Sequence, residues 1–414
     1  MENVRRLSLC SRSGIMDLTM PLGIYISVPF CRTKCSYCNF ASDVFSRAVF
    51  ERYVDRVCAD IANAQEVATE MGGHLDRAVD SIYLGGGTPT VLDSAQLERM
   101  FGAVRSRFDV SPEAEITVEC APGTLTPAML QTLLRCGVNR VSLGVQSFVD
   151  QEAAAVGRLH NREKIIEDIA RLRAAGINNI NIDLIAGLPH QTAESWEFSL
   201  AETITTAAPH VSVYMLEVDE DSRLGRELLA GGTRYHAHFV PDEEAMADFY
   251  LIACARLGAA GIPQYEISNF SRHAFESKHN LKYWTRQPYF GFGVDAHSML
   301  ISTEPNISAV RFAPSDSLDQ YMAASNLQRT VVSHESALEE FFFLGLRLTR
   351  GVRLRDMSAK FGEEAIQDAR IAIGELVEDG LMEHLEDSVC LTARGRLLSN
   401  EVFERFLATD KIAH

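Results

Sequence analysis

Three cysteines lie close together near the start of the chain, at Cys31, Cys35 and Cys38. Their spacing is C-x₃-C-x₂-C, and they follow directly after an apolar segment, Ile24–Val28, that is typical of a buried strand. Thiolates suit iron–sulfur clusters, so three of them can hold three irons of a [4Fe–4S] cubane. The fourth iron is then left without a protein ligand.

An iron without a protein ligand can chelate the amino and carboxylate groups of S-adenosylmethionine (AdoMet). An electron from the cluster could then cleave the sulfonium to a 5′-deoxyadenosyl radical, while the protein supplies position and shielding. A zinc site is one alternative, but structural zinc is commonly bound by two pairs of cysteine or histidine, and no second pair with that spacing is present. Three unrelated buried cysteines are the other alternative. The spacing favours the cluster.

A glycine-rich run, Gly85-Gly86-Gly87-Thr88-Pro89, follows the next apolar segment. Glycine has no side chain, so the backbone here can approach a ligand closely, and its amides could bind the amino acid moiety of AdoMet. Taken alone, such a run is also compatible with a simple turn. It lacks the Lys-Ser/Thr pair of a phosphate-binding loop, so nucleotide hydrolysis is not supported.

These motifs belong to a region in which short apolar runs alternate with amphipathic stretches of helical spacing, such as those from Phe50 to Ile61 and from Leu97 to Phe108. This alternation implies a parallel sheet with right-handed crossovers. Six such units predict an α/β fold with an open, partial (β/α)6 TIM-like barrel, and a doubly wound sheet is the alternative. The predicted strands are Ile24–Val28, Val79–Leu84, Ile116–Glu119, Arg140–Leu143, Ile177–Leu184 and Val211–Met215.

Polar residues recur at one end of these predicted strands. Glu119 ends the third strand, Gln146 follows the fourth, Asp183 lies at the end of the fifth, and Glu217 follows the sixth. The carboxyl ends of strands are where α/β barrels build their sites. The recurrence therefore predicts a site at this end of the barrel. The acidic segment from Glu217 to Asp221 is predicted to be a solvated turn.

The remainder of the chain predicts a helix near Glu243–Leu257, a short strand around Tyr265, and an ordered loop from residue 268 to 298. Helical patterns then run through Ala337–Leu348 and Glu363–Val377, followed by two short apolar segments and a terminal helix. This order is typical of a winged-helix-like domain. We therefore expect an N-terminal extension (1–20), a barrel domain with the cluster and AdoMet (21–304) and a smaller C-terminal helical domain (305–414).

Charge and composition restrict the partners. The formal net charge is −17 and there is no basic run, so nucleic acid is not an expected ligand. No apolar run approaches the ~18 residues of a membrane span, and no secretory signal is visible. The nine cysteines are an odd number without such a signal, so we expect a cytoplasmic chain with reduced thiols.

Several separate segments resemble the radical AdoMet (radical SAM) superfamily and, more narrowly, the oxygen-independent coproporphyrinogen III oxidase family. Tyr25, Pro29 and Phe30 precede the cysteines as they do in that family, and the Gly-Gly-Gly-Thr-Pro run follows. The resemblance extends from about Gly23 to the C-terminus. Further matching segments, in the same order, are S-L-G-V-Q-S-F from Ser142, G-R-L-H from Gly157, D-L-I-A-G-L-P from Asp183, Y-E-I-S-N-F from Tyr265 and L-G-L-R from Leu344.

The resemblance implies which residues bind the cofactors. It assigns the three cysteines of the motif to the [4Fe–4S] cluster. The positions that match AdoMet-contacting residues of the family are Tyr25, Tyr37, Gly86, Gly87, Thr88, Glu119, Gln146, Arg158 and Asp183. For the polar residues among them, the alternative is a simple capping role at the end of a strand.

Two features resemble the heme chaperone branch of this family rather than the oxidase itself. The oxidase has a further cysteine where this chain has Phe40, and His279-Asn280-Leu281-Lys282-Tyr283-Trp284 matches the H-N-x-x-Y-W motif of the chaperone branch. This resemblance implies that the chain binds heme, with His279 as a ligand, and delivers it to acceptor hemoproteins of the respiratory chain. Where an acceptor is bound to a membrane, the chain would contact it peripherally. A core histidine packed by aromatic residues is the alternative for His279.

One residue departs from the family pattern. Ser27 stands where the family usually has histidine, and serine cannot ligate iron as imidazole does. This departure weakens the oxidase reading. The alternative functions are oxygen-independent oxidation of coproporphyrinogen III to protoporphyrinogen IX and radical chemistry on another substrate; whether the chain is an enzyme is left open.

Overall fold

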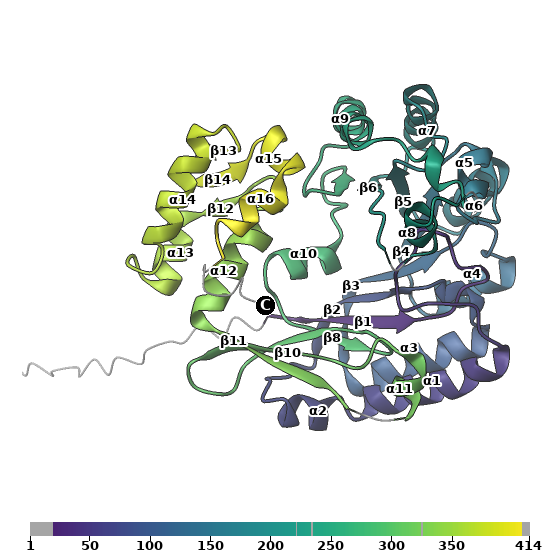
Figure 1. Cartoon of the computed structure of the whole chain (residues 1–414). Coiled ribbons are helices and arrows are strands. Elements are labelled where there is room, and N and C mark those ends of the chain that lie inside the picture. Colours follow the sequence, from purple (N-terminus) through teal and green to yellow (C-terminus); the bar gives the residue numbers. More distant parts are fainter. Residues whose placement is uncertain (1–19, 221, 233–234, 324–325, 408–414) are drawn as a thin grey trace, which may run out of the picture.

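The computed structural model describes residues 20–220, 222–232, 235–323 and 326–407. The extension predicted for residues 1–20 lies outside this part of the chain except for Met20. An 11-stranded sheet curves through the molecule with helices on its outer face, and a smaller helical domain lies at its side (Figure 1). None of the helices in the described ranges is long and apolar enough to cross a membrane.

Six parallel strands form the partial barrel that the sequence predicted. They are hydrogen-bonded neighbours in chain order, as expected for successive strand–helix units with right-handed crossovers. The prediction of an α/β, partial (β/α)6 TIM-like fold is thereby confirmed. The strands are β1 (Leu22–Val28), β2 (Ala78–Gly86), β3 (Asp109–Cys120), β4 (Arg140–Gln146), β5 (Asn179–Ala186) and β6 (His210–Met215).

The two faces of the barrel strands differ in polarity. Side chains alternate between faces along a strand, and on β1 the fully buried Ile24, Ile26 and Val28 alternate with Tyr25 and Ser27. Buried parallel sheets are usually apolar on both faces. Polar groups on one face of β1 therefore distinguish this barrel interior from a purely apolar core.

The crossover helices cover the outer face. Helix α1 (Arg47–Ala62) buries Phe50, Tyr53 and Val57 against the sheet, as its apolar spacing predicted. Helix α3 (Ser94–Arg107) starts with a capping box, in which Asp93 and Gln96 satisfy each other's backbone amides. The remaining crossover elements are α2 (Ala64–Glu70), η1 (Pro89–Val91), α4 (Pro127–Arg135), α5 (Asp150–Ala155), α6 (Arg162–Ala174) and α7 (Ala193–Thr205).

The segment after β6 differs in part from the prediction. It contains α8 (Arg223–Leu229), η2 (Ala237–Phe239) and α9 (Glu243–Ala259), and α9 confirms the predicted helix. The predicted strand around Tyr265 is wrong, because the strand is β7 (Asn269–Ser271), which pairs antiparallel with β6. The predicted loop over 268–298 is also wrong, since it contains β7, α10 (Lys278–Trp284) and β8 (Tyr289–Phe292).

The sheet continues beyond the barrel on the other side of β1. Strand β8 runs parallel to β1, and β9 (Ser298–Ile301), β10 (Ile307–Ala313) and β11 (Gln328–Ser333) follow antiparallel, with α11 (Leu318–Ala323) before β11. A boundary at residue 305 would therefore separate two strands of one sheet, because β9 and β10 are paired. The smaller domain has its own core, which begins in α12 (His334–Gly345).

The C-terminal domain consists of helices and a small sheet, as expected. Phe342, Ile373, Leu376 and Val389 are buried in a core separate from that of the barrel. The predicted hairpin is β13 (Met382–Leu385) and β14 (Ser388–Leu391), joined by β12 (Val352–Arg353) in a 3-stranded sheet. The other helices are α13 (Leu354–Phe361), α14 (Gln367–Glu378), α15 (Ala393–Leu397) and α16 (Ser399–Glu404).

Candidate functional site

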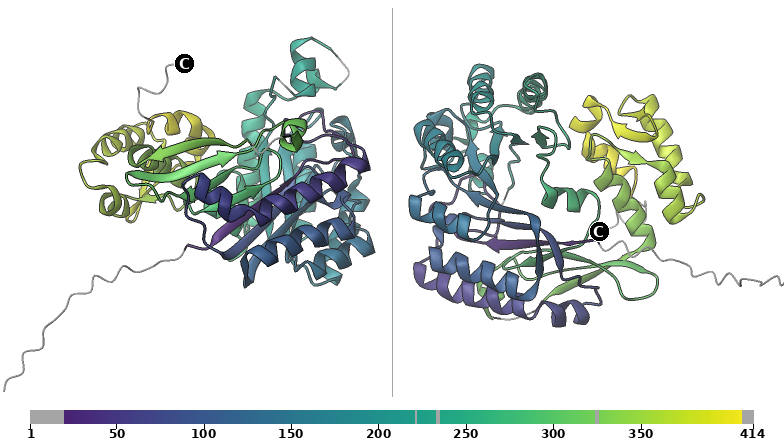
Figure 2. Two further views of the ribbon diagram at one scale, coloured as in Figure 1. Left: turned by 90° about the horizontal axis from the view of Figure 1, so that it is seen from below. Right: turned by 180° about the vertical axis from the view of Figure 1, so that it is seen from behind.

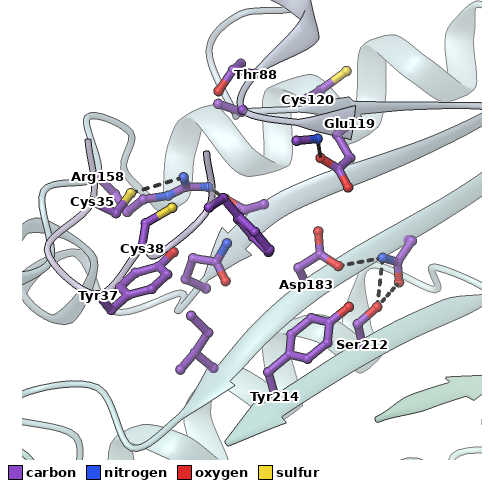
Figure 3. A pocket seen from close by; sticks show the side chains of 18 of the residues that line it. Cys35, Tyr37, Cys38, Thr88, Glu119, Cys120, Arg158, Asp183, Ser212 and Tyr214 are labelled. Carbon is purple, nitrogen blue, oxygen red and sulfur yellow. Dashed lines mark hydrogen bonds between the residues drawn. The ribbon is translucent and has the colours of Figure 1, made fainter. Parts of the chain in front are cut away.

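A cavity of about 780 Å³ opens at the carboxyl ends of the barrel strands, and residues of the C-terminal domain also line it. Figure 3 shows lining side chains from the barrel strands and the cysteine loop. The cavity brings together most of the side chains that the sequence predicted for the cluster and AdoMet. Polar residues at the ends of separate strands thus meet at one place, as the barrel architecture requires. The predicted residues that line the cavity are Cys31, Cys35, Cys38, Tyr37, Gly86, Gly87, Thr88, Glu119, Gln146, Arg158 and Asp183.

Each sulfur of the cysteine motif has a polar side chain beside it. Thr88 Oγ1 lies 3.9 Å from the first sulfur, Arg158 Nη1 donates across 3.6 Å to the second, and Ser42 Oγ lies 3.9 Å from the third. Hydrogen bonds and positive charge stabilise thiolates and tune iron–sulfur clusters. The donor set around the three sulfurs therefore fits a thiolate-bound cluster.

The cysteine loop is folded back on itself by Lys34. Its Nζ atom donates to the carbonyl oxygens of Phe40 at 3.0 Å and Ser42 at 2.6 Å. Across the described ranges, no three His, Cys, Asp or Glu side chains converge on a position for a single metal ion. A cubane does not require such convergence, because each of its cysteines binds a different iron.

The glycine run packs directly against the cysteine loop. The amide of Gly87 donates to the carbonyl of Val28 at 2.8 Å, and the amide of Thr88 donates to that of Phe30 at 2.7 Å. A Cβ atom on Gly87 would lie 2.7 Å from the Phe30 carbonyl and 3.0 Å from the Cys31 sulfur, so no side chain fits there. The glycine run therefore approaches the cysteine loop closely, and its amides at Gly87 and Thr88 are engaged within the protein. Their expected contact with AdoMet stays a prediction.

Glu119 is a half-buried carboxylate in the cavity wall. It accepts hydrogen bonds from Tyr83 Oη at 2.8 Å and from the amide of Gly86 at 3.0 Å. Burial, followed by the nearby charge of Asp183, raises the pKa of Glu119 to about 7. This carboxyl group can therefore gain or lose a proton near neutral pH.

Asp183 and Gln146 occupy neighbouring strands. Asp183 accepts from Ser142 Oγ at 2.9 Å and from Asn181 Nδ2 at 2.7 Å, and burial raises its pKa. Gln146 has a φ of 68° at an irregularity in the β4–β5 pairing. Non-glycine residues rarely adopt this left-handed conformation, and they do so preferentially at binding sites.

Tyr25 and His279 do not line the cavity. The Tyr25 hydroxyl lies beneath the glycine run, where a Cβ on Gly86 would come within 3.5 Å of it. His279 lies on α10, is 1% exposed, and hydrogen-bonds through Nδ1 to Ser81 Oγ at 3.1 Å and through Nε2 to Tyr283 Oη at 2.9 Å. Burial lowers the pKa of His279 to about 3. Both nitrogens of a neutral imidazole are thus already engaged inside the protein.

Sequence reasoning missed several residues of the cavity. Arg140 and Tyr214 lie on the inner face of the barrel, and Arg347 and Arg396 reach the cavity from the C-terminal domain. The period-2 alternation of polar residues along each strand was the signal for the barrel residues. Arg347 belongs to the L-G-L-R segment that resembles the family, but nothing in that segment indicated a place in the cavity. No local pattern marked Arg396, because its position depends on domain packing.

The segment that follows β6 covers the cysteine loop. The amide of Leu224 donates to the carbonyl of Ser36 at 2.8 Å, and Asn39 Nδ2 donates to Asp219 Oδ2 at 2.9 Å. The predicted solvated turn from Glu217 is therefore in contact with the cluster loop, although Asp221 lies outside the described residues. We call residues 217–220 and 222–229 the covering segment.

Two family models match the chain. The radical SAM superfamily model covers residues 25–201, and the HemN C-terminal domain model covers residues 332–398. A solved structure described as coproporphyrinogen III oxidase (HemN) from Escherichia coli, a radical SAM enzyme, superposes with a TM-score of 0.79 over 94% of this chain and 90% of that one, at 23% identity. Fold and cavity therefore define a radical SAM protein, a class that uses a [4Fe–4S] cluster and AdoMet.

Curated relatives narrow this class. Heme chaperone HemW of Bacillus subtilis (strain 168) is 35% identical over 385 residues, which cover 92% of this chain and 98% of that protein. Heme chaperone HemW of Escherichia coli (strain K12) is 31% identical over 94% of this chain and 98% of its own length. The chain belongs to the heme chaperone HemW family.

Proposed function

We propose that this chain is a heme chaperone, which binds heme and transfers it to acceptor hemoproteins. The observation that carries the proposal is the similarity to heme chaperones along nearly the whole chain, including both domains. Phe40 agrees with it, because this exposed residue of the cavity mouth replaces the additional cysteine of the oxidase motif. Hemoproteins of the respiratory chain are the acceptors we propose.

The cluster and AdoMet are proposed to bind in the barrel cavity. Cys31, Cys35 and Cys38 would hold the [4Fe–4S] cluster, which with AdoMet supplies one-electron chemistry when bound. Thr88, Arg158 and Ser42 would donate hydrogen bonds to the cluster thiolates. The residues proposed to contact AdoMet are Tyr25, Tyr37, Gly86, Gly87, Thr88, Glu119, Gln146, Arg158 and Asp183.

Heme ligation by His279 stays a prediction. Iron can reach its Nε2 atom only if the hydroxyl of Tyr283 leaves it, because the two atoms are hydrogen-bonded. Helix α10 would have to shift for a macrocycle to enter, since His279 is almost fully buried. The chaperone proposal itself does not depend on this residue.

One preparation of full-length protein can test the proposal. Anaerobic reconstitution with iron and sulfide should give a cubane absorption spectrum, and titration with heme should then give one heme per chain. Transfer of that heme to an apo-hemoprotein should follow. Coproporphyrinogen III and AdoMet added to the same preparation should give no protoporphyrinogen IX, and turnover would support the oxidase alternative instead.

The cluster ligands are tested separately from heme. Cys31→Ala, Cys35→Ala and Cys38→Ala should each reduce bound iron and acid-labile sulfide strongly. Cys58→Ala is the matched control, because this half-buried cysteine lies on α1 away from the cavity. Unchanged iron content in a variant lacking all three thiols would contradict the cluster assignment.

A further inference from the structure

Three histidines gather on the surface beside the covering segment. His236 and His238 lie at η2, and His190 lies on the turn between β5 and α7. Phe239 is 47% exposed between them. Figure 2 (left) shows α8 and η2, in teal, projecting beyond the end of the barrel. Neither the cluster nor the AdoMet cavity uses these residues.

Two of these imidazoles are held against each other. His190 Nε2 lies 3.0 Å from His236 Nδ1, and the amide of His190 donates to the carbonyl of Phe239 at 3.0 Å. Both histidines have left-handed backbones, with φ of 69° and 59°. Non-glycine residues keep this conformation only where the surroundings impose it, and such positions cluster at ligand sites.

The free nitrogen of His236 is suited to ligate iron. In the tautomer in which His236 Nδ1–H donates to His190 Nε2, the Nε2 atom of His236 carries a lone pair, and it has no hydrogen-bond partner in the described parts of the chain. Metal-ligating histidines use one nitrogen for the metal and engage the other in a hydrogen bond, which fixes the ring and raises its basicity. His190 and His236 have this arrangement.

Exposed apolar side chains lie on the elements that carry the pair. The ring of Phe239 lies 4.1 Å, centroid to centroid, from the rings of both His190 and His238. Leu228 and Leu229 on α8, which packs against η2, are 46% and 69% exposed. Aromatic and aliphatic side chains of this kind offer contact area to an apolar ligand beside the imidazole.

We propose that this surface is the docking site for the heme cargo, with His236 Nε2 as the axial ligand and the edge of the Phe239 ring toward the macrocycle. His190 is a positioning residue that orients the ligand. The inference rests on the proposed function, and it assigns heme binding to a site that does not include His279. A bare metal ion would need several converging side chains, which the described residues do not offer, whereas a porphyrin already supplies four nitrogens to its iron.

Heme binding to site-directed variants tests the proposal. Full-length, cluster-reconstituted protein is titrated with ferric heme, and the retained heme is quantified as the pyridine hemochrome after desalting. His236→Asn and His190→Asn are the informative variants, because asparagine tolerates a left-handed backbone but provides no imidazole. His273→Asn, which removes another exposed histidine, is the matched control.

His236→Asn should raise the heme Kd by about tenfold or more and alter the axial-ligand signature in the EPR spectrum of ferric heme. Added imidazole should restore that signature. His190→Asn should weaken binding by about tenfold and broaden the same signature, because the ring of His236 is no longer fixed. The control should match the wild type, and circular dichroism should show that all variants are folded.

Three outcomes would overturn the proposal. Unchanged heme affinity and spectrum in folded His236→Asn would exclude this surface as the docking site. Loss of heme from His279→Ala alone would move the site to α10 and leave the chaperone function intact. A wild-type protein that retains no heme would remove the docking site together with the proposed function.

Discussion

Arg158 joins the cysteine loop to the barrel, because its Nη1 atom donates to the sulfur of Cys35 across 3.6 Å while its Nη2 atom donates to the carbonyl of Gly144 on β4. A side chain on Gly144 would collide with this guanidinium, so the glycine creates the space that the arginine fills. The positive charge is thereby fixed beside one cluster ligand.

The first prediction concerns this charge. Arg158→Met should keep most of the iron but lower the reduction potential of the cluster, because a cation and a hydrogen bond to sulfur both favour the reduced state. The measurement is a redox titration followed by EPR. Arg135→Met, which removes an arginine exposed on α4, should leave the potential unchanged. A potential equal to the wild-type value in Arg158→Met would contradict the prediction.

The second prediction is a pH dependence from Glu119, whose pKa is about 7 in the fold against 4.5 as its ordinary value. Between these two pH values the folded chain keeps a proton that the unfolded chain releases. The free energy of unfolding should therefore fall as pH rises through this window, by up to about 3 kcal/mol. Urea titrations at both ends of the window measure the change.

Glu119→Gln should reduce that pH dependence, because glutamine keeps an acceptor for Tyr83 but does not titrate. Glu98→Gln removes an exposed carboxylate on α3 and serves as the control. An equally steep fall in Glu119→Gln would show that another group is responsible.

The third prediction concerns acid stability. His279 has a pKa of about 3 in the fold against 6.5 as its ordinary value, so the unfolded chain takes up a proton first as pH falls. The free energy of unfolding should decrease from pH 6.5 downward, with up to about 5 kcal/mol from this one group. Denaturant unfolding of His279→Gln should show a shallower decrease. The same slope in variant and wild type would count against a neutral, buried imidazole.

The fourth prediction concerns the attachment of α10. Lys282 is 2% exposed, and its Nζ atom lies 2.7 Å from Asp80 Oδ1 and donates to the carbonyl of Pro21 at 2.7 Å. Lys282→Met should lower the free energy of unfolding by about 2 kcal/mol, because it leaves the partly exposed Asp80 without its cation and the Pro21 carbonyl without its donor. Lys164→Met, which breaks an exposed pair with Glu167, should cost less than about 1 kcal/mol. Equal losses in the two variants would refute the structural role of the ion pair.

The barrel was predictable because its strands and helices carry regular apolar patterns. Ile24, Ile26 and Val28 alternate on β1, and α1 repeats its apolar residues at helical spacing, so both elements are visible locally. Helix α10 was not predicted because it has only 7 residues and its buried side chains are His279 and Lys282. Because the buried side chains of this helix are polar, the sequence has no apolar periodicity that would indicate it.

The site was predictable where its residues lie at the ends of strands. Glu119, Gln146 and Asp183 met in the cavity because parallel strands place their carboxyl ends at one edge. The burial of His279 matches the alternative of a core histidine. Its hydrogen bond to Ser81 could not be foreseen, because Ser81 is 198 positions away in the sequence. The approach of Arg347 from the other domain is likewise a product of tertiary packing.

The covering segment connects the two sites that we assign to this chain. The amide of Leu224 donates to the carbonyl of Ser36 in the cysteine loop, and Leu224 packs in one small apolar cluster with Ala237, next to His236. The loop proposed to hold the iron and the surface where we place the cargo are therefore attached to one short stretch of chain. A change of conformation in this stretch would act on both at once.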